Sequence, residues 1–285
     1  MRFGERWGLE WYFTPRCHAT AIRSEKMSPM TTVEAVLTVA VGLGAGVLSG
    51  LFGVGGGIVM TPGLSALAGL APIVAVATPL PVILPTASVG AYTYYRASEV
   101  DVRAAVWISL TGAGASGVGA ALTRVVNARF LLLVTAALLA WQSVQILRGR
   151  SRPTSEVSAG AIPAWALVLV GLVAGLLSGL LGIGGGLVIV PTLAGILGVP
   201  LKRALGTSLV AVVILVIPGT IVHAALDHLD WTAALFLAIG AVPGARLGAT
   251  IALGTKERTL RLMVGSFLAL VAVAYGVQQA IQLLS

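Results

Sequence analysis

Two runs of glycine are the residues of this chain whose type and spacing best suit ligand binding. Each run places four glycines in five positions, and the residues are Gly53, Gly55, Gly56 and Gly57, then Gly182, Gly184, Gly185 and Gly186. Glycine is so unfavourable inside a helix that a helix should break at each run. The backbone N–H groups at the start of the next helix, at the positive end of its dipole, suit an anion. The runs therefore predict an anion-binding site.

Close packing between helices is the alternative explanation for glycine in this chain. Ahead of the two runs, glycine recurs at every fourth position, at Gly42, Gly46, Gly50 and at Gly171, Gly175, Gly179. This spacing puts small residues on one helix face, where two backbones can approach closely. The sequence assigns these six glycines to packing and leaves both explanations open for the runs.

Three hydroxyl side chains and one cation in apolar stretches are further candidates for the site. Thr78, Thr207 and Ser208 lie near predicted helix starts and could donate to a ligand, although such residues often bond their own backbone. Arg246 is the only Lys or Arg within an otherwise apolar span, which makes it a functional candidate. Since it lies near the end of that span, extension of its side chain to the membrane surface is an equal alternative.

Proton coupling has one candidate, His223, whose side chain ordinarily titrates near neutrality. A packing or interfacial histidine is the alternative. Every Asp and Glu lies outside the predicted spans or at the end of one, so the sequence offers no buried carboxylate relay. Asp101 and Asp230 begin paired helices, where a capping role accounts for them.

The composition identifies an integral membrane protein. Of 285 residues, 57% are hydrophobic and only 10% are charged, and the mean hydropathy is +0.98. Soluble domains carry about 25% charged residues. The net charge of +8 comes from Lys and Arg in short breaks between apolar stretches, so we expect the lipid bilayer rather than nucleic acid as a partner. Cys17 is the only cysteine, which excludes an internal disulfide, and no motif predicts a metal or a cofactor.

The two glycine runs belong to an internal repeat. Residues 46–62 align without gaps on residues 175–191, with 11 identities in 17 positions at an offset of 129. The predicted domains are a basic and aromatic N-terminal segment (1–31), a first transmembrane repeat (32–147), a basic linker (148–162) and a second transmembrane repeat (163–285). A start of translation at Met27 or Met30 is an alternative explanation for the first segment.

Each repeat contains five predicted apolar segments. They are 33–52, 57–70, 74–95, 104–123 and 129–147, then 164–181, 186–198, 204–225, 231–253 and 259–283. If all five segments of a repeat cross the membrane, the second repeat is inverted relative to the first. If the short second segment of each repeat instead enters and leaves on the same side, each repeat has four passes and the two repeats are parallel. Five passes place ten Lys and Arg on one face against two on the other, which favours inversion. The predicted fold is an all-α polytopic membrane protein with two repeats and about 8–10 membrane segments broken at glycine.

Three motifs resemble the sulfite exporter TauE/SafE-like membrane permeases. They are the doubled G-x-L-S-G-x-x-G-x-G-G-G pattern (46–57 and 175–186), Ala204-Leu-Gly-Thr-Ser-Leu209, and Gly240-Ala-Val-Pro-Gly-Ala-Arg-Leu-Gly248. The resemblance covers Thr32 to about Leu283 and implies transport of sulfite, thiosulfate, sulfonates or other small anions. The first repeat departs from the pattern of the second at Pro79, which stands opposite Ser208 and lacks a hydroxyl.

We therefore predict a permease, not an enzyme, that moves a small anion across the cell inner (plasma) membrane. Export of sulfite, or of a related sulfur oxyanion or organosulfonate, is implied by the resemblance alone. A membrane assembly factor or sensor without transport is the alternative, and a membrane-embedded enzyme is less favoured because the sequence contains no paired intramembrane carboxylates. The sequence leaves open whether the chain forms a homo-oligomer.

Overall fold

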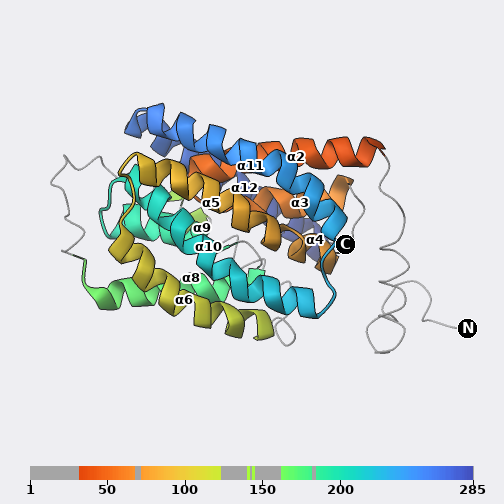
Figure 1. Ribbon diagram of the computed structural model, residues 1–285, viewed down its shortest axis with the longest axis horizontal. Helices are drawn as coiled ribbons and strands as arrows, with labels where there is room; N and C mark the ends of the chain where they lie inside the picture. Colours follow the sequence, from red (N-terminus) through yellow and green to blue (C-terminus); the bar gives the residue numbers. More distant parts are fainter. Residues whose placement is uncertain are drawn as a thin grey trace, which may run out of the picture.

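Helices make up every regular element in the part of the chain that the structure, a computed structural model, describes (Figure 1). That part comprises residues 32–67, 72–122, 140–141, 143–144, 162–181 and 184–284. The predicted segment 1–31, most of the predicted helix 129–147 and nearly all of the linker lie outside the described residues. Four of the described helical stretches are long and apolar enough to cross a membrane, which are Thr32–Phe52, Val74–Arg96, Leu201–Ala225 and Trp231–Gly254.

The helices follow the predicted segments closely. Those of the first half are α2 (Thr32–Phe52), α3 (Gly57–Leu67), α4 (Pro72–Ala77), α5 (Pro79–Arg96) and α6 (Val102–Leu122). Those of the second half are α8 (Ala164–Leu181), α9 (Gly186–Pro191), the π-helix η3 (Thr192–Ile196), α10 (Leu201–Ala225), α11 (Trp231–Gly254) and α12 (Glu257–Leu284). The predicted segment 74–95 corresponds to α4 and α5, which adjoin at Thr78, whose φ of −56° and ψ of −34° stay in the helical region. Pro79 and Pro81 follow, and neither has an N–H group to continue the helical hydrogen bonds.

Two pairs of parallel helices form the outer layers, and both pairs join the two halves of the chain. In the first pair, Gly42, Gly46 and Gly50 of α2 lie against the backbone of α11. In the second pair, Gly171, Gly175 and Gly179 of α8 lie against the backbone of α6. The residue numbers of the contacting positions increase together in both helices of a pair, so the two helices run in the same direction. The predicted packing role of these six glycines is therefore consistent with their contacts.

Helices α5 and α10 lie between the two outer pairs (Figure 1). Gly90 of α5 faces Leu209 of α10, and Leu80 of α5 faces Gly219 of α10, so these two helices are antiparallel. The offset of 129 makes α5 and α10 counterparts, and their opposite directions agree with an inverted arrangement. The internal repeat itself stays a prediction from the sequence.

Basic residues gather at one end of the bundle. The backbone N–H of Asp101 donates to Thr207 Oγ1 at 2.9 Å, and Lys202 Nζ donates to the Leu253 carbonyl at 2.6 Å. These bonds bring together the α5–α6 turn, the start of α10 and the end of α11. The described Lys and Arg at or near this end are Arg96, Arg103, Lys202, Arg203, Lys256, Arg258 and Arg261.

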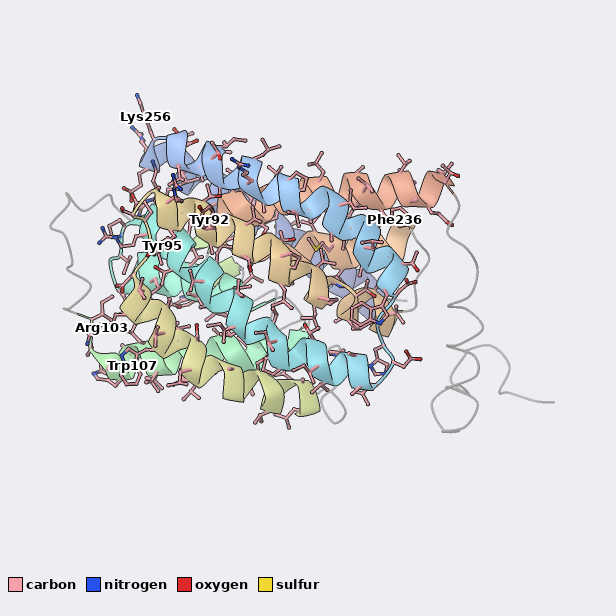
Figure 2. All side chains as sticks on the ribbon, viewed as in Figure 1. Tyr92, Tyr95, Arg103, Trp107, Phe236 and Lys256 are labelled. Carbon is pink, nitrogen blue, oxygen red and sulfur yellow. The ribbon has the colours of Figure 1, made fainter. Side chains whose placement is uncertain are left out.

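Exposed aromatic side chains accompany the basic residues. Figure 2 shows Tyr92, Tyr95 and Trp107 at the same end as Arg103 and Lys256. Tyr92 and Tyr95 are each 61% exposed and Trp107 is 38% exposed. Tyrosine and tryptophan prefer the membrane–water interface, so this end of the bundle has the composition of a membrane surface.

The charge distribution predicts that the α5–α6 and α11–α12 turns face the cytoplasm and that the α10–α11 turn faces the opposite side. In a Cys17→Ser background, a membrane-impermeant maleimide should label Leu226→Cys on intact cells. It should label Ala97→Cys and Gly254→Cys only after the membrane is opened. Labelling of Leu226→Cys from the same side as Ala97→Cys would contradict the inverted arrangement and support parallel repeats.

Tight packing of α2 on α11 predicts a strong contrast between two neighbouring glycines. A Cβ at Gly46 would collide with the Ala241 backbone carbonyl, whereas a Cβ at Gly44 meets no atom within 4 Å. Gly46→Ala should destabilise the fold by about 1–3 kcal/mol, while Gly44→Ala should be neutral or stabilise by up to about 1 kcal/mol. The measurement is the thermal unfolding midpoint in detergent, and equal effects would contradict this packing.

Candidate functional site

The first glycine run breaks the helix as predicted. Helix α2 ends at Phe52, and Gly53, Gly55 and Gly56 have φ angles of +68°, +87° and +84°. These values lie in the left-handed region that glycine adopts far more readily than other residues. The Gly56 carbonyl then accepts hydrogen bonds from the N–H groups of Val59 and Met60, which begins α3. We call residues 53–56 the first break.

The second glycine run has the same local structure. Gly184 and Gly185 have φ angles of +85° and +74°, and α9 begins at Gly186. The Gly185 carbonyl accepts hydrogen bonds from the next turn in the same way as Gly56 does. We call the glycines at 184–186, the last of which begins α9, the second break. Gly182, the remaining predicted glycine of this run, lies outside the described residues.

The two breaks meet directly in the interior of the protein. A Cβ on Gly186 would lie 2.5 Å from the Gly53 carbonyl oxygen and 2.8 Å from Val54 Cα, so only glycine permits this approach. Ser208 Oγ donates a hydrogen bond of 2.9 Å to the same Gly53 carbonyl. Ser208 therefore lies against the first break and holds it in place.

Thr78 and Thr207 join the two halves of the chain at opposite ends of α5 and α10. Thr207 Oγ1 accepts from the backbone N–H of Asp101 at 2.9 Å, and Thr78 Oγ1 accepts from that of Asp230 at 3.1 Å. Both threonines are fully buried. Their hydroxyl oxygens therefore hold turns of the opposite half.

The two aspartates in these turns cap helices, as expected. Asp101 Oδ1 accepts from the Ala104 N–H at 3.0 Å at the start of α6. Asp230 Oδ1 accepts from the N–H groups of Thr232 and Ala233 at 2.9 and 3.0 Å at the start of α11. These bonds use donors that the first turn of a helix leaves without an intrahelical partner.

Arg246 does not join the breaks. Its side chain is exposed, whereas the face of α11 that contains Ala241, Ala245 and Ala249 is buried. Arg246 thus lies on the outer surface of the bundle. This position corresponds to the alternative in which the side chain extends to the membrane surface.

His223 lies near the far end of α10, also away from the breaks. It is 5% exposed, and its Nδ1 atom lies 3.4 Å from Nδ1 of His228. The sequence did not predict this histidine pair, which the turn after α10 creates. No group of three or more His, Cys, Asp or Glu side chains comes together within the described ranges.

Two serines at the breaks were missed by the sequence reasoning. Ser49 is 0% and Ser178 is 2% exposed, and neither hydroxyl has a hydrogen-bond partner among the described residues. Ser49 Cβ lies 3.3 Å from the position of a Cβ built on Gly56, and Ser178 Cβ lies equally close to one built on Gly185. Their signal was present, because the offset of 129 pairs them within the doubled motif.

A bundle of apolar helices whose broken segments meet at its centre is typical of a membrane transporter. The family model for the sulfite exporter TauE/SafE matches residues 38–275 of this chain. The chain therefore belongs to the sulfite exporter TauE/SafE family. No solved structure matches it.

Curated relatives have corresponding names. The chain is 28% identical over 266 residues to the probable membrane transporter protein YunE of Bacillus subtilis, which covers 83% of this chain and 95% of YunE. It is 30% identical over 226 residues to a probable membrane transporter protein of Xylella fastidiosa, which covers 78% of this chain and 87% of that protein. These similarities identify the chain as a multi-pass membrane transporter.

The hydrogen bond from Ser208 to the Gly53 carbonyl predicts that loss of the Ser208 hydroxyl destabilises the fold. Ser208→Ala removes the donor to the buried Gly53 carbonyl, which should destabilise the protein by about 1–3 kcal/mol. Ser88→Ala is the matched control, because the Ser88 hydroxyl is exposed and bonds only the Leu84 carbonyl of its own helix. Thermal unfolding in detergent measures both, and a control effect as large as that of Ser208→Ala would contradict a specific role for this hydrogen bond.

Proposed function

We propose that this transporter carries small anions and that they cross the bilayer beside the contact between the two breaks. The observation that carries the proposal is the approach of Gly186 to Gly53 and Val54. Non-helical backbone at membrane depth is tolerated only where it is buried in protein or lines a cavity. Transporters place substrate sites at broken helices of this kind, near the interface between two halves of the chain.

The groups at the breaks favour an anion over a cation. The 11-residue helix α3 begins at the first break, and the first N–H groups of a helix have no intrahelical carbonyl partners. The positive end of its dipole also points to the break. The carboxylates of Asp101 and Asp230, by contrast, cap helices at the two ends of the bundle. A metal cation would need several oxygen ligands, usually including carboxylates.

Sulfite, or a related sulfur oxyanion or organosulfonate, is the substrate we propose, and the support for it is the description of the family as sulfite exporters. The printed names of the relatives specify membrane transport and no substrate. We place the protein in the inner (plasma) membrane. The potential there is negative inside, so an anion leaves downhill by about 2.3 kcal/mol per charge per 100 mV. Export therefore needs no coupled proton.

The test is anion flux through purified protein in liposomes. The panel comprises sulfite, thiosulfate, sulfoacetate, sulfate and chloride, with and without a pH gradient. We expect saturable flux of at least one sulfur anion without the gradient. Absence of anion flux from correctly folded protein would contradict the proposal and favour an assembly or sensory role.

Flux through variant proteins in the same liposomes tests where the anion passes through the protein. Gly56→Leu should abolish flux, because its side chain would enter the break beside Ser49. Gly44→Leu, on the exposed side of α2, is the matched control and should transport normally. Arg246→Ala should also transport normally, since its side chain lies outside the bundle. Normal flux through folded Gly56→Leu would move the path away from the first break.

A further inference from the structure

The hydroxyls of Ser49, Ser109 and Ser178 are exceptions among the hydroxyl groups of the described helices, and two of them, Ser49 and Ser178, lie at equivalent positions beside the breaks. The hydroxyls of Thr38, Thr86 and Thr93 each donate to the carbonyl four residues earlier, at 2.7 to 2.8 Å. Ser49 and Ser178 occupy helices too, yet their buried hydroxyls have no such bond. Buried polar groups nearly always have partners, so an unpartnered pair at equivalent positions requires an explanation.

Both hydroxyls occupy the same place relative to a break. Ser49 lies one helical turn before Gly53, whose N–H donates to the Ser49 carbonyl at 2.8 Å. Its side chain packs against Gly56, the residue directly before α3. Ser178 packs against Gly185 in the same way. An unpartnered buried donor thus lies beside the first N–H groups of α3, and a second one lies across the contact between the breaks.

We propose that the Ser49 and Ser178 hydroxyls donate hydrogen bonds to the transported anion and that the site selects a singly charged oxyanion or sulfonate over a doubly charged one. This inference rests on the proposed function and names the substrate class of the same site. A sulfonate or a singly charged sulfur oxyanion has several acceptor oxygens, which suits two hydroxyls and the N–H groups of a helix start.

The charge preference follows from the neutrality of these donors. Hydroxyls and backbone N–H groups carry no net charge, and a helix start contributes about half of one positive charge. The described Lys and Arg lie at or near one end of the bundle or, for Arg246, on its outer face. The cost of taking an ion out of water rises with the square of its charge, whereas attraction to fixed dipoles rises only in proportion to the charge. A doubly charged anion is therefore disfavoured.

Competition in liposomes tests the charge preference. Labelled sulfite flux is measured with excess methanesulfonate, which carries one charge, or excess sulfate, which carries two. We expect methanesulfonate to inhibit at a concentration at least about tenfold lower than sulfate does. Equal or stronger inhibition by sulfate would overturn the preference. Absence of flux for sulfite and for every other anion would instead contradict the proposed function.

Serine variants test the ligands. Ser49→Ala and Ser178→Ala should each raise KM about tenfold, as loss of a hydrogen bond to a charged group does. Neither should lower the unfolding midpoint, since no protein hydrogen bond is lost. Ser109→Ala is the matched control, because Ser109 on α6 is also buried and without a hydrogen-bond partner among the described residues. Its KM should be unchanged. An unchanged KM in a folded Ser49→Ala, Ser178→Ala double variant would overturn the assignment.

Discussion

Direct contact between the backbones of the two breaks is the constraint on which the rest of this structure depends. Gly186 approaches Gly53 and Val54 so closely that no side chain fits between them. The neighbouring glycines adopt positive φ angles, which lets each helix end and the next begin inside the bundle. Glycine therefore serves two purposes here, since it forms the breaks and also allows them to touch.

The remaining contacts keep these two breaks together. Within a bilayer, helices gain little from the hydrophobic effect on association, so close packing and hydrogen bonds must hold them. Each half contributes one helix to α2–α11 and one to α6–α8, with glycine against backbone in both pairs. Thr78 and Thr207 add hydrogen bonds between the halves at the two ends of α5 and α10. The two halves are thus interlocked, and the contact between the breaks depends on both.

The described charged side chains lie away from the two breaks, so the groups at the breaks are electrically neutral. The described basic residues other than Arg246 gather at or near one end, which the positive-inside rule predicts to face the cytoplasm. The breaks offer backbone N–H groups and the hydroxyls of Ser49 and Ser178, which are neutral donors. In the site we propose, such donors bind an anion without a full positive charge that would hold it too strongly for release. Moderate binding suits transport, because the substrate must also leave.

The sequence by itself determined the class of protein, the helix positions and the two breaks. Hydropathy, charge-free length and glycine conformation are local properties, so they can be predicted from neighbouring residues. Only the tertiary structure decided which helices pack against one another and where the polar side chains point. It placed Arg246 on the outer surface, tied Thr78 and Thr207 to distant turns, and left Ser49 and Ser178 unpartnered at the breaks. These outcomes depend on which helices pack together, and the spacing of residues along one helix does not contain that information.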